Sequence, residues 1–229
     1  MLEAIHLGLH GRGGILFEGF DAVFRQGDIW AITGSPSTGK TRLLGVLHGE
    51  RRPDAGDVLV DGVSMFRGPA GKSPAFRRSS AMVPDPVEAG PDTVGGLFRL
   101  AALAMGGVSE AERKEREESL LSLVGLPGIS GEGFRSLSTA EKFRAGLAVE
   151  LFREPRVLLL DAPVTRAGKD WTETLCLLLR ALAREGRIVV LAERELPLLF
   201  PMKPVREELR FGPVTLTQLA AGDAGEGAA

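Results

Sequence analysis

The sequence predicts an α/β fold in which a parallel sheet carries a phosphate-binding loop, with an N-terminal antiparallel β layer and a small helical subdomain. Three observations predict it. The segment Gly34–Thr41 fits the complete pattern G-x-x-x-x-G-K-S/T and stands between an apolar segment and leucines at helical spacing. Residues 157–160 and 188–192 are continuously apolar, which is typical of parallel strands covered on both faces. Helical patterns dominate residues 87–150, which we interpret as an insert in the core.

Length and composition favour one domain. The chain has 229 residues, enough for one substantial core. Its 28 basic and 30 acidic residues give a net charge of -2, which offers no electrostatic case for a nucleic-acid partner. No apolar run approaches the roughly 18 residues of a membrane-spanning helix. The single cysteine, Cys176, lies in an apolar run, so we expect it to pack in the core, and a reducing cytoplasm fits.

The N-terminal part reads as strands around one helix. Residues 2–24 alternate apolar and polar positions between glycines, which predicts antiparallel strands joined by turns. We expect a helix from Thr41 to about Gly49. After a turn rich in Pro, Asp and Gly, residues 57–62 alternate again and are expected to return to the β layer. Residues 68–74 are expected to form a loop.

The middle of the chain is predicted to be helical. Residues 80–83 read as a short buried strand, which the prolines on both sides of Asp85 terminate. Residues 93–124 follow as helix, with a capping box at Ser109–Glu112 and one apolar face formed by Leu97, Leu100, Ala101 and Ala104. A further helix is expected from Leu137 to Leu151.

The C-terminal part alternates strand and helix. Residues 157–161 predict a central strand that delivers Asp161 to its C-terminal end. A helix over 171–184 and a buried strand over 188–192 follow. Prolines weaken the pattern from Pro197 to Pro213, where no element is predicted. We assign residues 1–219 to one domain and expect the small, polar segment 220–229 to be a disordered tail.

The phosphate-binding loop carries most of the predicted chemistry. Its backbone N–H groups and the N-terminus of the next helix would surround a phosphate chain, with a point charge from Lys40 and a magnesium ligand from the Thr41 hydroxyl. The alternative is a turn that contains a lysine by chance, but the flanking strand and helix argue against it. The residues expected to contact the nucleotide here are Gly34, Ser35, Ser37, Thr38, Gly39, Lys40 and Thr41.

The order of motifs resembles the nucleotide-binding domain of ABC transporters from Leu2 to about Leu196. The most specific stretch is Gly34–Gly62, where the residues after the loop follow the family's pattern nearly position for position. The resemblance implies Mg-ATP binding, with Asp161 as the Walker B magnesium ligand. It also implies a head-to-tail dimer that holds two ATP molecules, each between one subunit's phosphate loop and the other's signature helix, and that drives a membrane partner.

Further site residues follow from the resemblance alone. His10 aligns with the aromatic residue that stacks on adenine, although a solvated loop residue is an equal reading. Asp85 aligns with the glutamine that senses magnesium and the γ-phosphate, and a carboxylate could ligate the metal but donates no hydrogen bond. Ser138 aligns with the signature serine that meets the partner's nucleotide.

The hydrolysis positions depart from the family. Asp161 is followed by Ala162 where the family has a glutamate that polarises the attacking water, and general-base catalysis is typically worth about 10²–10⁴-fold. Glu193 aligns with the switch histidine, an anion where a donor is needed. The signature Leu-Ser-Gly-Gly-Gln appears as 137–141, Leu-Ser-Thr-Ala-Glu, without either glycine. Ser138 and Glu141 make a capping box, which favours plain helix capping over a working signature.

Three functional hypotheses follow. The first is an ATP-binding subunit of an ABC-type transporter or membrane complex that binds Mg-ATP and hydrolyses it weakly or not at all. The second is a competent transport ATPase that uses Glu193 or Asp85 as its base. The third is a P-loop small-molecule kinase with Arg77–Arg78 as its lid, for which a solvated turn is the simpler reading.

The resemblance also implies partners and a location. They are a transmembrane permease, docked beside residues 85–88, and a second nucleotide-binding subunit, identical or different. Both place the chain in the cytoplasm, on the inner face of the cell membrane through its membrane partner. The sequence does not identify the cargo, and it shows no group of residues at the spacing of a separate metal site.

Overall fold

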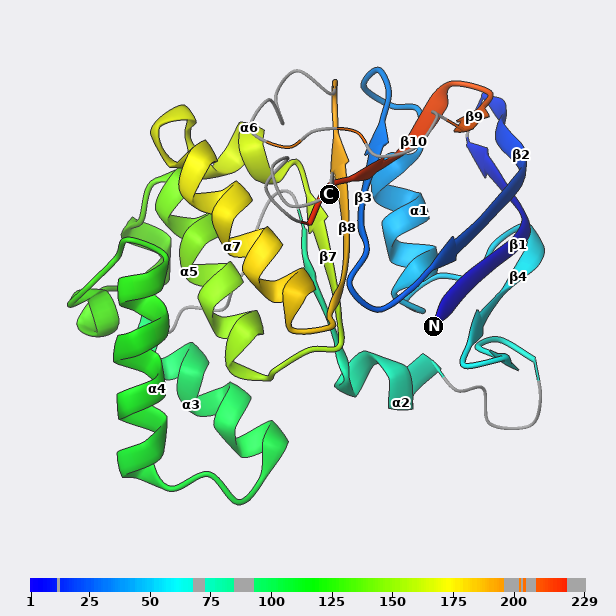
Figure 1. Ribbon diagram of the computed structural model, residues 1–229. Coiled ribbons are helices and arrows are strands. Elements are labelled where there is room, and N and C mark those ends of the chain that lie inside the picture. Colours follow the sequence, from blue (N-terminus) through cyan, green and yellow to red (C-terminus); the bar gives the residue numbers. More distant parts are fainter. Residues whose placement is uncertain are drawn as a thin grey trace, which may run out of the picture.

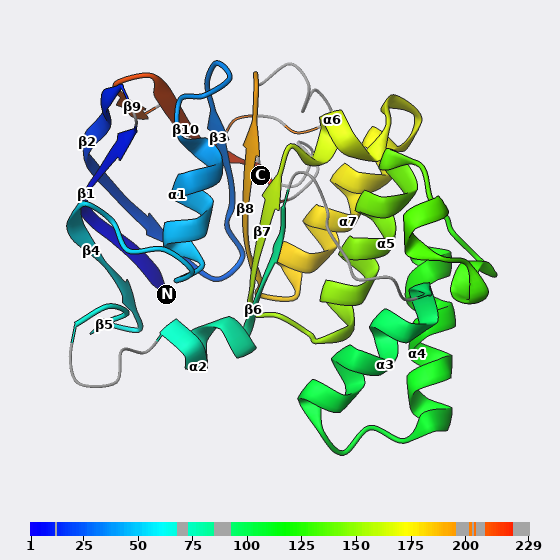
Figure 2. The same cartoon turned by 180° about the vertical axis from the view of Figure 1, so that it is seen from behind.

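The computed structural model describes residues 1–11, 13–67, 73–84, 93–195, 202, 204 and 209–221 and has the predicted α/β architecture (Figure 1). A four-stranded antiparallel layer has the order β2-β1-β4-β5, and a six-stranded sheet has the order β6-β7-β8-β3-β10-β9. Helix α1 lies between the two sheets, and α5, α6 and α7 lie on the opposite face of the larger sheet, as Figure 2 shows from behind. The phosphate-binding loop therefore sits where the two layers meet.

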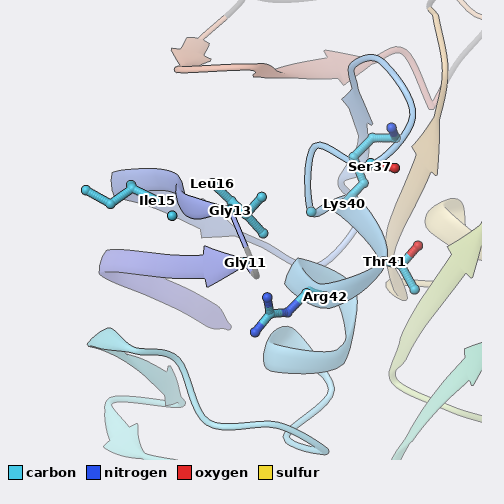
Figure 3. A pocket seen from close by; sticks show the side chains of 10 residues that line it. Gly11, Gly13, Ile15, Leu16, Ser37, Lys40, Thr41 and Arg42 are labelled. Carbon is cyan, nitrogen blue, oxygen red and sulfur yellow. The ribbon is translucent and has the colours of Figure 1, made fainter.

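The antiparallel layer confirms the strands predicted at residues 2–24 and 57–62. Strands β1 (Leu2–Gly11) and β2 (Gly14–Phe24) form a hairpin, and β1 also pairs with β4 (Ala55–Val60), which continues into β5 (Val63–Ser64). Apolar side chains on one face of these strands are buried toward α1. Gly11 and Gly13, near the adjoining ends of β1 and β2, line the same cavity as the phosphate-binding loop (Figure 3).

The larger sheet confirms the predicted parallel core and adds strands that the sequence did not indicate. Strands β6 (Ser80–Val83), β7 (Val157–Asp161), β8 (Ile188–Glu193) and β3 (Ile29–Thr33) are parallel neighbours, and every residue of β3, β7 and β8 is buried. Two antiparallel strands, β10 (Val214–Leu219) and β9 (Leu209–Phe211), extend this sheet beyond β3. All four parallel strands point their C-terminal ends at the same edge, where the site lies.

Helices cover both faces of the larger sheet. Helix α1 (Lys40–Leu47) begins within the phosphate-binding loop, and its leucines are fully buried between the layers. Helices α5 (Thr139–Phe152), α6 (Pro163–Ala167) and α7 (Thr172–Arg184) pack on the other face. Cys176 in α7 is fully buried as predicted, and burial raises the pKa of its thiol to about 11. Short elements complete the chain: α2 (Ser73–Arg78), η1 (Ile129–Gly131), η2 (Phe134–Ser136) and η3 (Lys169–Trp171).

The helical part contains α3 (Val94–Met105) and α4 (Glu110–Leu123), both packed against α5. Ser109 caps α4 by accepting a hydrogen bond from the Glu112 amide. The predicted apolar face of α3 was right for Ala101, which is buried, and for Leu97, which packs against the core, and wrong for Leu100, which is 54% exposed, and Ala104, which is also exposed. The buried residues of the helix are Val94, Gly95, Phe98, Ala101 and Ala102. The packing of the Phe98 ring on Phe152, edge to face with centroids 5.6 Å apart, accounts for this orientation.

The predictions for the loop at residues 68–74 and for the C-terminal tail fall partly or largely on residues that the structure does not describe. The loop expected over residues 68–74 lies partly outside the described residues, and its end belongs to α2, which was not predicted. The predicted tail lies outside the described residues from 222 onward. Among the residues that the structure describes, no helix is long and apolar enough to cross a membrane.

Candidate functional site

The phosphate-binding loop joins β3 to α1 and turns through left-handed backbone (Figure 3). Gly39 has φ 94° immediately before α1, and Ser37 also has a positive φ of 66°. The positive φ requires glycine at position 39, and a Cβ atom there would also lie 2.9 Å from the end of the Leu16 side chain, which would have to shift. The first amides of α1 have no partner within the helix and are available to an anion at the loop.

Lys40 folds back across this loop. Its Nζ donates hydrogen bonds to the carbonyl oxygens of Gly34 at 2.6 Å and Ser35 at 2.8 Å. The Thr38 hydroxyl donates to the same Ser35 carbonyl at 2.9 Å, which fixes the loop around the ammonium group. Burial lowers the pKa of Lys40, while the charges of Asp161 and Glu193 act in the opposite direction. The loop thus holds a positive charge in position for a phosphate.

Thr41 and Asp161 form the candidate magnesium site. The Thr41 hydroxyl donates to Asp161 Oδ2 at 2.6 Å, and Asp161 is only 5% exposed at the C-terminal end of β7. A hydroxyl and a carboxylate are hard oxygen ligands, and Mg²⁺ usually takes one or two protein oxygens together with phosphates and waters. These two residues therefore fit a nucleotide-bound magnesium ion. In the described part of the chain, no group of three or more His, Cys, Asp or Glu could hold a metal by itself.

A cavity of about 480 Å³ lies between the β1–β2 hairpin and the loop (Figure 3). Its size is in the range of small-molecule sites. In the close view, Leu16 points toward the loop, while Ile15 points away from it. The residues that line the cavity are Gly11, Gly13, Gly14, Ile15, Leu16, Ser37, Gly39, Lys40, Thr41 and Arg42.

His10 lies beside this cavity and does not line it. Its backbone N–H donates to Asp54 Oδ2 at 2.7 Å, and its carbonyl oxygen accepts a hydrogen bond from the Arg42 guanidinium. The exposed ring lies with Nε2 3.8 Å from Glu18 Oε1. Sequence reasoning missed Leu16 and Arg42, because the approach of a hairpin to a loop leaves no mark in local spacing.

Beyond Asp161 the chain turns sharply. Ala162 adopts the left-handed region, with φ 51° and ψ 44°, and its N–H donates to the Ala192 carbonyl at 2.8 Å. This conformation is unfavourable for a residue with a Cβ atom. The short helix α6 begins at the next residue, Pro163. The methyl group of Ala162 offers no proton acceptor next to the aspartate.

Glu193 is enclosed at the end of β8 and caps α6. Its Oε1 accepts hydrogen bonds from the backbone amides of Val164 at 2.6 Å and Thr165 at 3.2 Å. Its Oε2 accepts from the Thr165 hydroxyl at 3.0 Å and from the Arg194 amide at 3.4 Å. The side chain is 1% exposed, and this burial raises the pKa of Glu193, against the lowering effect of the hydrogen bonds. Three of the four hydrogen bonds that the Glu193 carboxylate accepts therefore come from residues of α6.

The predicted capping box at the start of α5 is confirmed. Glu141 Oε2 accepts hydrogen bonds from the Ser138 amide at 2.8 Å and the Ser138 hydroxyl at 2.7 Å, and the Glu141 amide donates back to Ser138 Oγ at 3.3 Å. The bond from the Ser138 side chain holds the pKa of Glu141 below its usual value. Both polar groups at the start of this helix are thereby engaged within the chain.

Two other predicted positions lie away from the loop or outside the structure's description. The Arg77 guanidinium donates to the Gly49 carbonyl at 2.6 Å, beyond the C-terminal end of α1, whereas the loop is at its N-terminal end. This placement contradicts a lid role for Arg77–Arg78. Asp85 and the rest of the proposed docking segment 85–88 lie outside the described residues.

Known proteins resemble this chain in sequence. The family model described as ABC transporter matches residues 17–165. The methionine import ATP-binding protein MetN of Thermobifida fusca is 32% identical over 184 residues, covering 80% of this chain and 57% of that protein. The arabinose import ATP-binding protein AraG of Burkholderia pseudomallei is 29% identical over 186 residues, covering 80% of this chain and 36% of that protein. The chain thus spans less than two thirds of these relatives' length.

Solved structures share the fold. A bacterial ABC transporter cassette solved as a dimer has a TM-score of 0.76 at 20% identity, covering 87% of this chain and 90% of that chain. The structure of cbiO1 from Clostridium perfringens, part of the ABC transporter complex cbiONQ, has a TM-score of 0.70 at 23% identity, covering 86% of this chain and 80% of that chain. At these identities the likeness concerns the fold.

Proposed function

Because this chain belongs to the ABC transporter family of ATP-binding domains, we propose that it binds Mg-ATP in the cavity between hairpin and loop and hydrolyses it weakly or not at all. One observation carries the second half of the proposal. Asp161 is held at the loop by Thr41, yet the residue after it, Ala162, has a methyl group where a proton acceptor would be needed. The proposal thus combines two residues suited to binding magnesium, Thr41 and Asp161, with a residue at position 162 that cannot act as a base.

The binding half rests on the loop and its partners. Gly34, Ser35, Ser37, Thr38 and Gly39 supply the backbone of the phosphate cradle, and Lys40 supplies its charge. A magnesium ion, when bound between Thr41 and Asp161, would neutralise phosphate charge. The hairpin side of the cavity is lined by glycines, Ile15 and Leu16, whose apolar surface suits the flat faces of a nucleobase.

The hydrolytic half lacks a free acceptor among the described residues of the site. Glu193 was the first alternative base, but each of its carboxylate oxygens already accepts two hydrogen bonds, and three of these four come from α6 or its start. To take a proton from water it would have to release Val164 and Thr165 and leave their amides without a partner, at a cost of about 1–3 kcal/mol for each buried group. This favours a silent site over a competent one. Asp85, the second alternative, stays a prediction.

The assembly belongs to the same proposal. The names of MetN and AraG describe import ATP-binding proteins, so we propose a transmembrane permease as the partner of this chain. A second nucleotide-binding subunit, identical or different, would complete the pair, as the dimeric cassette suggests. The chain would then work at the inner face of the cell membrane. With its hydrolytic groups exchanged, it would act as a switch or scaffold beside a competent subunit.

The test separates binding from turnover. Purified chain is mixed with a substoichiometric amount of radiolabelled ATP and magnesium, and bound nucleotide and released phosphate are followed together. We expect ATP to be retained on the protein and to remain intact, and we expect Lys40→Ala to lose the retention. Failure of the wild-type chain to retain any nucleotide would refute the binding half, and rapid magnesium-dependent phosphate release would refute the silent half.

A further inference from the structure

Glu193 occupies a particular place at the edge of the larger sheet. In the parallel pairing of β8 with β3, Glu193 stands opposite Thr33, the last residue before the phosphate-binding loop. On its other side, the preceding residue Ala192 stands opposite Asp161. The Gly34 amide donates to the Arg194 carbonyl at 3.2 Å, which ties the loop to the chain just after Glu193. Glu193 therefore lies between the phosphate loop and the magnesium-ligand aspartate.

Two buried acids act on one lysine at this edge. The charges of both Asp161 and Glu193 favour the protonated form of Lys40, against the effect of its burial. Asp161 is 5% exposed and Glu193 is 1% exposed, so water and salt screen these charges far less than they screen surface charges. The charges of Asp161 and Glu193 thus partly offset the positive charge of Lys40, which would attract the terminal phosphate.

The two acids differ in how their charge is balanced. Asp161 accepts the Thr41 hydroxyl and is positioned to share a magnesium ion, which would cancel its charge. The donors that reach Glu193 from the described residues are three backbone amides and one hydroxyl, all neutral. Hydrogen bonds of this kind stabilise a carboxylate without removing its net charge. None of these donors carries a charge that would balance an ionised Glu193, whereas a bound magnesium ion would balance Asp161.

We propose that Glu193 makes this site prefer nucleoside diphosphates, because its buried charge opposes the last phosphate of a triphosphate and leaves ADP bound at least as tightly as ATP. The inference rests on the proposed nucleotide binding and deepens it by naming the phosphate state that the site retains. Both nucleotides meet the same loop and the same hairpin. They differ in the terminal phosphate, which brings about one further negative charge toward Lys40 and Glu193.

The experiment compares Mg-ADP with Mg-ATP by isothermal titration calorimetry on the full chain. For the wild type we expect the Kd of ATP to equal or exceed that of ADP. In Glu193→Gln the amide oxygen still accepts from Val164 and Thr165, and the new NH₂ group donates to the Thr165 hydroxyl. The 3.4 Å hydrogen bond from the Arg194 amide is lost, but α6 keeps its cap. We expect this variant to bind ATP about tenfold more tightly, ~1.4 kcal/mol, and ADP within about twofold of the wild type.

Two variants serve as controls. Glu195→Gln removes an exposed carboxylate two residues after Glu193. It should leave the ratio of the Kd values for ATP and ADP unchanged. Thr165→Val retains the Glu193 carboxyl and removes one hydrogen bond to it, so it should leave the ratio much closer to the wild-type value than Glu193→Gln does. If the ratio followed the loss of this hydrogen bond, Glu193 would act through α6 and not through its charge, and the proposal would be overturned.

The outcomes separate this inference from the function on which it rests. A wild-type chain that binds ATP at least tenfold more tightly than ADP overturns the inference and leaves nucleotide binding intact, as does a Glu193→Gln variant that strengthens both nucleotides equally. A chain that binds neither nucleotide refutes the proposed function itself. The wild-type ratio can overturn the inference even if Glu193→Gln does not fold.

Discussion

The Thr41 hydroxyl donates a hydrogen bond to Asp161 Oδ2 at 2.6 Å across 120 residues of sequence. This contact joins the start of α1 to the end of β7 and brings together the two oxygen ligands that magnesium would need. It depends on the parallel sheet, because β7 and β3, with β8 between them, end at the same edge. The two proposed magnesium ligands are therefore positioned by the core of the fold.

Removing the hydroxyl tests this pair directly. Thr41→Val keeps the shape of the side chain and removes one ligand, so we expect the gain in nucleotide affinity that magnesium brings to fall about tenfold. Titration of nucleotide with and without magnesium measures it. Thr174→Val, on an exposed position of α7, is the matched control and should change nothing. An unaltered magnesium effect in Thr41→Val would remove Thr41 from the metal site.

Lys40 is expected to carry the charge of the cradle. Lys40→Ala should weaken Mg-ATP binding about ten- to hundredfold, because a hydrogen bond to a charged group is worth about 1.5–3 kcal/mol. Fluorescence titration with a labelled ATP analogue gives the affinity, and circular dichroism checks the fold. Lys114→Ala, at an exposed position of α4, should bind as the wild type does. Equal affinity in both variants would contradict the assignment of the loop.

The capping box predicts a pH-dependent contribution to stability. Hydrogen bonds from Ser138 lower the pKa of Glu141, so the stabilisation that they give is present above the carboxyl's usual pKa of 4.5 and is lost as the pH falls through the lowered value. Ser138→Ala should cost about 0.5–2 kcal/mol at pH 7. Urea unfolding at pH 7 and near pH 3 measures both. A cost that stays the same at low pH would mean that Glu141 takes no part in the cap.

The orientation of α3 predicts opposite effects for neighbouring residues. Phe98→Ala should lower the free energy of unfolding by about 3–5 kcal/mol, because Phe98 is fully buried and packs on Phe152. Leu100→Ala should change it by less than about 0.5 kcal/mol, because Leu100 is 54% exposed. Urea denaturation compares them. A similar loss of unfolding free energy in both variants would mean that Leu100 lies on the buried face of α3, as the sequence pattern had predicted.

The elements around the loop could be predicted because local signals specify them. The loop pattern, the continuous apolar runs of β7 and β8 and the alternation of β1, β2 and β4 each carry their own evidence. Strands β9 and β10 were missed for a physical reason. The pairing of β10 with β3 joins residues about 180–190 positions apart, and the prolines before it obscure the pattern, although residues 214–217 alternate apolar and polar types.

The site could be predicted less completely than the fold. Lys40, Thr41 and Asp161 come together as expected, since motif and strand position determine them. The roles of Leu16 and Arg42 depend on how the hairpin approaches the loop, and this is set by packing between two sheets. The enclosure of Glu193 depends on α6, a helix of one turn whose sequence begins with proline and reads as a turn.

The rate of single-turnover ATP hydrolysis tests the central claim most directly, because it asks whether any group in the chain activates water. Wild-type chain, Glu193→Gln and Asp85→Asn are each mixed with substoichiometric radiolabelled Mg-ATP, quenched at intervals and analysed for phosphate. The account predicts that the wild type binds ATP and leaves it intact. Neither substitution should then change the rate of phosphate release. Rapid hydrolysis by the wild type that falls by orders of magnitude in Glu193→Gln or Asp85→Asn would contradict it.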